Sequence, residues 1–428
     1  MHPVLYLVAE FTLTIFVIGF TAPQSLIRHA GLLLIVYWVY QCIPLCMEYM
    51  VRTPWAALVG GYAVTWGYHY LDVALLNRWS FEQRAPTSGL VKPSEENQKA
   101  EENNKANGVS KTQGQSFYDR FCFGFKITAS SRFVGTPYQA RNTPKVVATE
   151  RKHFLLRELV IIIVSYSVLD LIQSQNDPEI ANKFLTVDKV PFFSRWGQVS
   201  AEELVIRSFT VLAAAIGLNC VQGGVYHICA LLAVSSKLSY PQDWPPFYGS
   251  FHEAYTLRKF WNIFWHQTNA RKFSSIAHYV VHRILRLPRG TVTSRYLRIL
   301  AAFFASGFLH LLDDFAAGVS FKDSGALHMF AAQALGMIFE DVVQQIYSKL
   351  SPQARLPARV EATIGYLWTA LFLIWSIPAY MYPMMWRGNL GLNDSTIPYS
   401  LFDSAERMKG IGALGAAALI AGAGILID

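Results

Sequence analysis

Residues 299–320 read ILAAFFASGFLHLLDDFAAGVS, and this apolar run decides the class of fold. A helix of about twenty apolar residues crosses the ~30 Å hydrocarbon core of a bilayer. Similar blocks occur at 3–21, 30–47, 54–76, 154–173, 203–236, 325–347, 364–386 and 409–427. Since these blocks rarely alternate with period two, a transmembrane β-barrel is not expected. We predict an all-α, polytopic transmembrane helix bundle of about nine spans.

The composition agrees with a membrane protein. Only 15% of the residues are charged, well below the ~25% of an average soluble domain. The net charge of +8 does not indicate nucleic-acid binding, because the basic residues lie in loops between apolar blocks. Five cysteines without a CxxC pair predict neither a disulfide framework nor a metal site. The expected macromolecular surroundings are therefore membrane lipid, and the sequence leaves the oligomeric state open.

Two long basic loops predict the orientation. Residues 78–152 hold 13 Lys/Arg against 7 Asp/Glu, and residues 237–298 hold 10 against 2. The positive-inside rule places both loops in the cytoplasm and the N-terminus in the lumen. The block 203–236 must then cross once. At ~1.5 Å per residue it is about 50 Å long, so it must tilt, protrude or break, for instance at Gly217, Gly223 or Gly224.

Three regions follow from this organisation. Residues 1–77 are N-terminal transmembrane helices, retained because the first block lacks a basic leader and a clear cleavage site. Residues 78–152 form a cytoplasmic loop with a polar, disordered insertion at 94–116. Residues 153–428 form the catalytic transmembrane core. Asn393 opens a lumenal glycosylation sequon, and the expected location is the endoplasmic reticulum as a multi-pass protein.

His310 is the sharpest candidate for chemistry. If the helix enters the membrane near residue 299, His310 lies about 16 Å in, close to the middle of the membrane. A neutral imidazole is tolerated there and can act as a general base. Asp313 and Asp314 follow three and four residues later on the same helix face and could orient the ring. The alternative is a histidine that is hydrogen-bonded between helices.

A second cluster lies in the loop 237–298, whose aromatic and basic residues predict helices at the cytoplasmic interface. It contains Asn262, Trp265, His266 and Gln267. One interpretation is an interfacial anchor, since tryptophan prefers headgroup depth. The other is the floor of a site, where His266 points to the reaction centre. The residues expected near an anionic cofactor are Arg258, Lys259, Trp261, Arg271 and Lys272.

Glu340 and Asp341, near the end of the block 325–347, either line a polar cavity or pair with a loop arginine, and pairing is favoured.

Several catalytic signatures are missing. The sequence has no GxSxG, Walker A or HExxH motif and no DDxxD run for Mg²⁺ and a diphosphate.

The order of several motifs resembles wax synthase-like acyltransferases of the membrane-bound O-acyltransferase superfamily. The fungal branch reads DWPP-x-FG, SLRDFW-x-x-x-WHQ and SG-x-x-H. Similar stretches are Asp243–Gly249, Thr256–Gln267 and Ser306–His310, and Arg132–Asn142 loosely matches an upstream element. This chain has Phe133 and Tyr138 where that element has glycine and tryptophan. It also has Lys259 where the second motif has an acid, and Asn262-Ile263 where that motif has glycine-arginine.

The resemblance implies acyl transfer from an acyl-CoA co-substrate to a hydroxyl, with no bound cofactor or metal. The family's membrane-embedded histidine maps onto His310, and its second polar residue maps onto His266. Small fungal members act in secondary metabolism, which implies acetyl-CoA and a lipophilic terpenoid or meroterpenoid alcohol as partners. Two alternatives remain at this point: a proton-coupled secondary transporter that uses His310, Asp313 and Asp314 as a relay, and a membrane terpene cyclase.

Overall fold

The computed structural model describes residues 1–90, 116–146, 149–175, 177–350, 356–388 and 395–426. The expected insertion at 94–116 falls outside this part of the chain except for Ser116, and the sequon residue Asn393 falls outside it as well. The described residues are mostly helical, and their one sheet is a short antiparallel pair, Trp79–Ser80 (β1) with Ala85–Pro86 (β2). The prediction of an all-α chain is confirmed.

Seven helices of the described part are long and apolar enough to cross a membrane. They are α1 (Pro3–Phe20), α2 (Ile27–Met50), α8 (Ala201–Ser235), α11 (Val292–Ala316), α12 (Ala326–Leu350), α13 (Ala358–Ser376) continued by α14 (Pro378–Gly388), and α15 (Arg407–Leu426). The other two predicted spans are helices too, α3 (Thr53–Tyr70) and α6 (Arg151–Ser174), but neither is among these seven. The count of nine spans therefore stays a prediction.

Shorter elements connect these helices. The first loop contains α5 (Phe117–Ala129), and the connection between α6 and α8 contains α7 (Pro178–Phe184), η2 (Val187–Lys189) and η3 (Phe193–Gln198). The second loop forms η4 (Pro241–Asp243), η5 (Phe251–Glu253), α9 (Leu257–Lys259), η6 (Phe260–Phe264), α10 (Ala270–Tyr279) and η7 (Val280–Ile284). A wider π-helical turn, η1 (Leu71–Leu76), follows α3. The second loop is thus a chain of short helices, as predicted.

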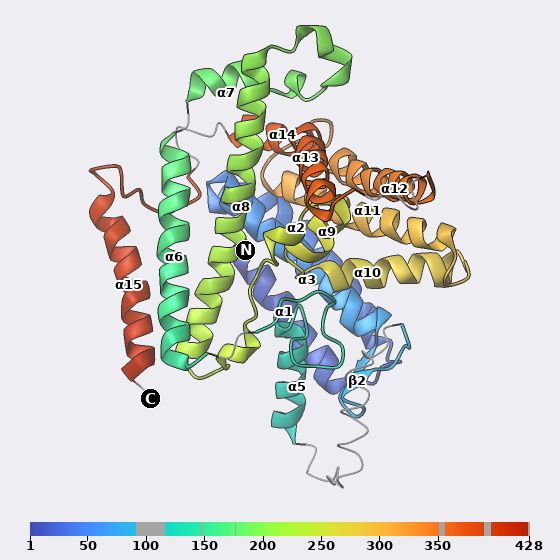
Figure 1. Cartoon of the computed structure of the whole chain (residues 1–428). Coiled ribbons are helices and arrows are strands. Elements are labelled where there is room, and N and C mark those ends of the chain that lie inside the picture. Colours follow the sequence, from blue (N-terminus) through green and yellow to red (C-terminus); the bar gives the residue numbers. More distant parts are fainter. Residues whose placement is uncertain (91–115, 147–148, 176, 351–355, 389–394, 427–428) are drawn as a thin grey trace.

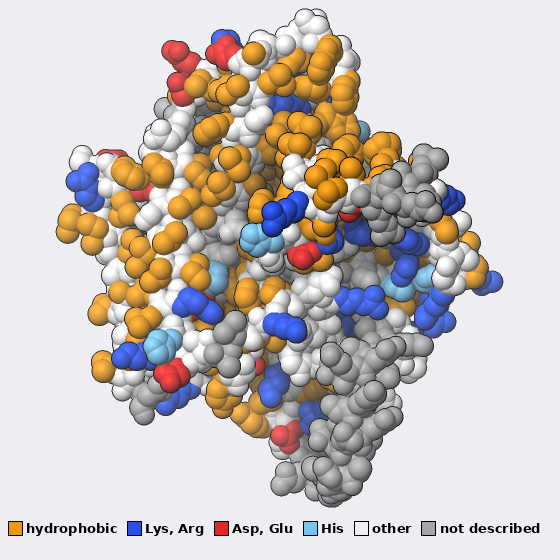
Figure 2. Space-filling model, in the orientation of Figure 1, with side chains coloured by type: hydrophobic (Ala, Val, Ile, Leu, Met, Phe, Trp, Pro, Cys, Tyr) orange, Lys and Arg blue, Asp and Glu red, His pale blue; other side chains and the backbone are white. Residues whose placement is uncertain are grey.

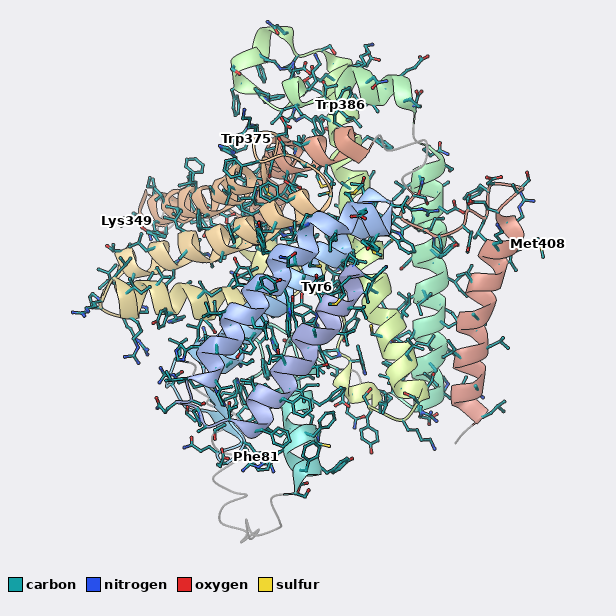
Figure 3. The ribbon with its side chains drawn as sticks, turned by 180° about the vertical axis from the view of Figure 1, so that it is seen from behind. Tyr6, Phe81, Lys349, Trp375, Trp386 and Met408 are labelled. Atoms are coloured by element: carbon teal, nitrogen blue, oxygen red, sulfur yellow. The ribbon has the colours of Figure 1, made fainter. Side chains whose placement is uncertain are left out.

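The helices form two groups (Figure 1). In one, α6, α8 and α15 stand side by side and bury Phe154, Leu155 and Leu231 between them. In the other, α1, α2 and α3 pack together and α11 joins α3 and α12. Figure 3, which views the chain from behind, shows α1 with the labelled Tyr6 running beside α2. Ile18 and Ile35 are completely buried between these helices.

The long block at 203–236 forms one unbroken helix. α8 has 35 residues, which corresponds to about 52 Å. Gly217, Gly223 and Gly224 lie inside it without interrupting it. Its first turns extend beyond the other long helices, next to α7 (Figure 1). Of the three possibilities for this block, the structure therefore excludes a break, and tilt and protrusion both stay predictions.

The two basic loops lie at the same end of the molecule. Arg132 of the first loop donates hydrogen bonds to the carbonyl oxygens of Pro245 and Pro246 in the second, at 3.0 and 2.8 Å. Arg151, at the start of α6, donates to the carbonyl oxygens of Val234 and Ser235 at the end of α8. The loop before α6 and the loop after α8 share this end because α6 and α8 run antiparallel. Which side of the membrane this end faces stays a prediction.

The helix that carries His310 begins before the apolar block. α11 starts at Val292, because Thr291 caps it by accepting a hydrogen bond from the backbone N–H of Ser294 at 3.2 Å. The expected point of entry into the membrane, near residue 299, therefore lies inside α11. Gly307 lets α12 approach closely. A Cβ atom added there would lie 3.1 Å from the Cβ atom of Phe330.

Candidate active site

A cavity of about 2570 Å³ lies between the two groups of helices and opens to the surface. α3, α8, α11, α13 and the second loop all contribute to its lining, which is mostly apolar. Ligand pockets are commonly ~300–1,000 Å³, so this cavity has room for two co-substrates together. His266 and His310 both line it, which brings together the two catalytic residues expected from the sequence.

His310 is held by three neighbours. Its Nδ1 lies 2.9 Å from Oδ2 of Asp313 and 3.3 Å from the hydroxyl oxygen of Tyr380. Its ring stacks on Phe330 with centroids 4.6 Å apart. An N–H on Nδ1 directed at the carboxylate leaves the lone pair on Nε2. This tautomer gives the ring a basic nitrogen for the cavity.

Asp313 and Asp314 have different roles although they are adjacent. Asp314 accepts a hydrogen bond from the Ser324 hydroxyl at 2.5 Å and does not contact the His310 ring. Asp313 approaches His310, and its other oxygen packs against α3 at Gly61. A Cβ atom at Gly61 would lie 2.7 Å from Oδ1 of Asp313. Of the two carboxylates, Asp313 is therefore the one that lies within hydrogen-bond distance of the ring.

His266 is fixed by the residues on either side of it. The Thr268 hydroxyl lies 2.7 Å from Nδ1 of His266, and Phe247 stacks on the ring with centroids 5.3 Å apart. Burial is the main reason that the pKa of His266 falls to about 3, and nearby His310 adds to the effect. His266 is therefore neutral at cellular pH.

The residues around His266 form a rigid turn. The side-chain amide of Gln267, buried at 3% exposure, donates to the carbonyl oxygens of Trp265 at 2.6 Å and Trp261 at 3.3 Å. The Trp261 indole N–H donates to Gln333 of α12 at 3.1 Å. The backbone carbonyl oxygen of Asn262 accepts a hydrogen bond from the side-chain amide of Asn142 in the first loop. Asn262 and Trp265 line the cavity, whereas Gln267 supports the turn from behind.

Three of the basic residues expected at a cofactor are neutralised by carboxylates. Arg258 pairs with Asp341 at 2.6 Å. Lys259 pairs with Glu253 at 2.8 Å. Arg271 lies 3.4 Å from Asp72 and stacks on Phe133. Their charges therefore stabilise the fold locally.

Lys272 differs from these three because no carboxylate pairs with it in the described part of the chain. It is buried and donates to the Thr268 carbonyl oxygen at 2.7 Å and to the Asn269 side chain at 3.0 Å. It also lines the cavity. Of the expected cofactor residues, Lys272, Arg258 and Trp261 reach the cavity wall.

Glu340 and Asp341 are structural, as favoured from the sequence. Glu340 accepts hydrogen bonds from the backbone N–H groups of Leu257 and Arg258 and so caps α9. Asp341 pairs with Arg258 and also with Arg295, at 2.7 Å.

Sequence reasoning missed Tyr380, Thr268 and the role of Arg132. The Arg132 guanidinium donates to the Tyr226 hydroxyl at 2.6 Å as well as to the two proline carbonyls. Its neighbour Phe133 has a φ of 51°. This left-handed backbone conformation is unfavourable by about 1 kcal/mol or more for a residue other than glycine. Phe133 stacks on Trp79 with centroids 5.0 Å apart. The signal in the sequence was Phe133 itself, which stands where the upstream motif has a glycine.

Comparisons with known proteins point in one direction. Residues 244–332, which contain both histidines, match the membrane bound O-acyl transferase family. The acetyltransferase aurG of Calcarisporium arbuscula is 33% identical over 376 residues, 87% of this chain and 90% of that protein. The acetyltransferase fsoF of Humicola fuscoatra is 29% identical over 400 residues, 88% and 95% respectively. No solved structure matches the chain.

Proposed function

This chain belongs to the membrane bound O-acyl transferase family, and we propose that it moves an acetyl group from acetyl-CoA to a hydroxyl of a lipophilic terpenoid or meroterpenoid in secondary metabolism. It is a multi-pass membrane protein with acyltransferase activity. Its relatives aurG and fsoF are named acetyltransferases, which supports acetyl as the transferred group. The observation that carries the proposal is the His310–Asp313 pair opposite His266 in one apolar cavity.

His310 acts as the general base in this reaction. Its Nε2 takes the proton of the acceptor hydroxyl as that oxygen attacks the thioester carbonyl carbon. Asp313 accepts the Nδ1 hydrogen bond, holds the ring in the required tautomer and stabilises the imidazolium that forms.

His266 stabilises the negative charge on the thioester oxygen. When the Thr268 hydroxyl donates to Nδ1, the N–H of a neutral His266 sits on Nε2. That N–H donates a hydrogen bond to the oxyanion of the tetrahedral intermediate. The neutral state of His266 at cellular pH agrees with this role.

The second half of the reaction returns the proton. The tetrahedral intermediate collapses, the carbon–sulfur bond breaks, and CoA leaves as a thiolate. The His310 imidazolium gives its proton to that sulfur, so the products are an acetate ester and CoA with the enzyme unchanged. No covalent acyl-enzyme is needed.

The cavity lining supports a lipophilic acceptor. The described residues of α3 and α8 on its walls are mostly apolar, including Leu58, Phe209, Leu212 and Ile216. A polycyclic hydrocarbon skeleton fits such a surface through apolar burial at about 25 cal/mol per Å². Its hydroxyl is the group that must reach His310.

We place the protein in the endoplasmic reticulum, with residues 153–428 as the catalytic core and Asn393 as a glycosylation site.

The test uses microsomes that contain the full-length chain. They are incubated with labelled acetyl-CoA and a pool of terpenoid alcohols, and ester formation is measured. We expect labelled ester from wild type and none above background from His310→Ala. His310→Gln is the control of similar size that cannot act as a base, and it must be equally inactive.

Absence of labelled ester from every acyl-CoA offered, with a properly inserted wild-type protein, would sink the transferase proposal. Label from a long-chain acyl-CoA but not from acetyl-CoA would contradict the acetyl donor alone. Proton-coupled uptake of a solute by wild type without ester formation would favour the transporter alternative.

A further inference from the structure

Four basic side chains near the second loop lack a compensating acid. They are Arg141, His278, Arg289 and Arg298, called here the arginine–histidine cluster. No ion pair joins Arg141, Arg289 or Arg298 to a carboxylate among the described residues. The neighbouring Arg258 and Arg295 share Asp341. Positive charge that the protein leaves uncompensated marks a place for an anion.

Arg298 and His278 form the half-buried part of the cluster. Nη1 of Arg298 lies 2.8 Å from Nε2 of His278. Since a guanidinium only donates, Nε2 of His278 accepts and its N–H lies on Nδ1. That Nδ1 and the Nε of Arg298 are both buried without a hydrogen-bond partner. Two buried N–H donors therefore lack an acceptor, which costs about 1–3 kcal/mol each unless a ligand supplies one.

Two members of the cluster belong to the wall of the candidate active-site cavity. His278 and Arg298 line the same cavity as His266 and His310. Arg141 comes from the first loop, where the next residue, Asn142, donates to the backbone carbonyl of Asn262 at 3.0 Å. Figure 2 shows Lys, Arg and His side chains gathered over the ends of α10 and α11.

Electrostatics confirm that these groups are close together. Burial first, and then the charges of Arg298, Arg289 and Arg141, lower the pKa of His278 to about 4. His282 stands beside it, with ring centroids 5.4 Å apart. A neutral His278 donor surrounded by arginines suits an acceptor that carries several negative charges.

We infer that the arginine–histidine cluster binds phosphate groups of the CoA donor, in place of the ion-paired Arg258, Lys259 and Arg271. This rests on the proposed function, since it names the residues that hold the donor of that reaction. A phosphate supplies only acceptors, so it satisfies the unpartnered donors of His278 and Arg298 while the exposed Arg141 and Arg289 neutralise its charge. The thioester end then extends along the cavity towards His310.

The experiment compares Arg141→Gln and Arg298→Gln with the control Arg283→Gln. Arg283 is an exposed arginine of η7 that does not line the cavity. Its variant therefore loses one positive charge but leaves the arginine–histidine cluster unchanged. Binding of adenosine 3′,5′-bisphosphate to the full-length protein in neutral detergent is measured first. We expect each cluster variant to weaken it by about 10- to 100-fold, and the control by less than twofold.

The same variants are assayed for ester formation. The KM for acetyl-CoA should rise by a similar factor, while kcat and the KM for the acceptor change less than twofold. Arg141 is exposed, so Arg141→Gln keeps the test valid if Arg298→Gln fails to fold. Unchanged nucleotide binding in a folded Arg141→Gln protein, or a rise only in the acceptor KM, overturns the inference.

Three further outcomes separate the sources of phosphate and the two proposals. If cluster variants bind the nucleotide normally but lose co-purifying anionic phospholipid, the cluster holds a lipid headgroup and the inference fails. If wild type binds the nucleotide through the cluster but makes no ester, the proposed reaction fails while the phosphate site stands. If the cluster variants form ester and bind the nucleotide as wild type does, the proposed reaction stands and the inferred phosphate site is refuted.

Discussion

His266 and His310 face one cavity, but their neighbours hold them for opposite tasks. A carboxylate at Nδ1 of His310 favours a proton on that nitrogen and a lone pair on Nε2. A hydroxyl at Nδ1 of His266 can donate to it and leave the proton on Nε2. In the proposed reaction, two identical side chains thereby serve as a base and as a hydrogen-bond donor.

The first prediction concerns Asp313. Asp313→Asn should lower kcat by about 10²- to 10⁴-fold, because the amide can donate to Nδ1 and so favour the tautomer with a protonated Nε2. The KM for acetyl-CoA should change little, and thermal unfolding should show a folded protein. Asp314→Asn is the control, since Asp314 bonds to Ser324 and not to the ring. Equal losses of kcat in both variants would contradict the distinction.

The second prediction concerns Thr268. Thr268→Val has nearly the same shape but cannot donate to His266, so kcat should fall by roughly 10- to 100-fold as the oxyanion donor loses its orientation. Thr268→Ser retains the hydroxyl and should restore most of the activity. The readout is the split between kcat and KM at saturating acceptor. The prediction fails if serine and valine behave alike.

Much of this residue-scale arrangement could be read from the sequence, and some could not. His310 and Asp313 are three residues apart, so helix periodicity placed them together. Tyr380 is 70 residues further along the chain and reaches the same Nδ1 atom through packing of α14. Thr268 lies two residues after His266, yet only the turn geometry shows that its hydroxyl meets the ring.

At the scale of elements, the approach of α3 to α11 holds the base in place. Gly61 contributes no side chain, which lets the Asp313 carboxylate lie against α3. Gly60, one residue earlier, faces Ala316 of α11 in the same way, since an added Cβ atom would lie 2.2 Å from the Ala316 Cβ atom. The helix pair therefore depends on small residues at its contact.

The third prediction tests this contact. Gly61→Ala should lower kcat at least tenfold, because the new methyl group must push the Asp313 carboxylate away from its position beside His310. Gly412→Ala in α15 is the matched control, since nothing lies within 4 Å of the Cβ atom that it adds. Activity and thermal stability are measured for both in detergent. A Gly61→Ala enzyme with wild-type kcat would show that Asp313 is not held by α3.

The lengths of the apolar blocks predicted where the helices are. The sequence did not predict which acids pair with the basic loop residues. Each predicted block is helical, because twenty apolar residues have no other way to satisfy their backbone in a bilayer. The basic loop residues were expected at a cofactor, yet Arg258 meets Asp341 from α12 and Arg271 meets Asp72 from η1. A sequence shows a charge but not the acid that tertiary packing brings to it.

At the scale of the whole molecule, the two groups of helices explain why the cavity is large. α6, α8 and α15 contact one another extensively, and α8 meets α13 and α14, while α1, α2, α3 and α11 form the other group. The cavity is lined from both sides of this division. A lipophilic acceptor within the bilayer and a CoA donor at the basic loops can therefore reach His310 from different directions.

The last prediction decides between seven and nine spans. If α3 and α6 both cross the membrane, the first loop is cytoplasmic and the connection between α6 and α8 is lumenal. An epitope tag inserted at residue 110 should then be digested by protease added to sealed microsomes, whereas a tag next to Asp188 in η2 should be protected until detergent is added. If neither α3 nor α6 crosses, the first loop changes sides, because α1 and α2 return the chain to the side of the N-terminus. Both tags would then lie on the same side, so protection of both tags would contradict nine spans. A protected tag at residue 110 together with an accessible tag at Asp188 would instead reverse the orientation of the whole chain. Because Arg132 ties the first loop to the turn before His266, that result would also reverse the side from which CoA enters.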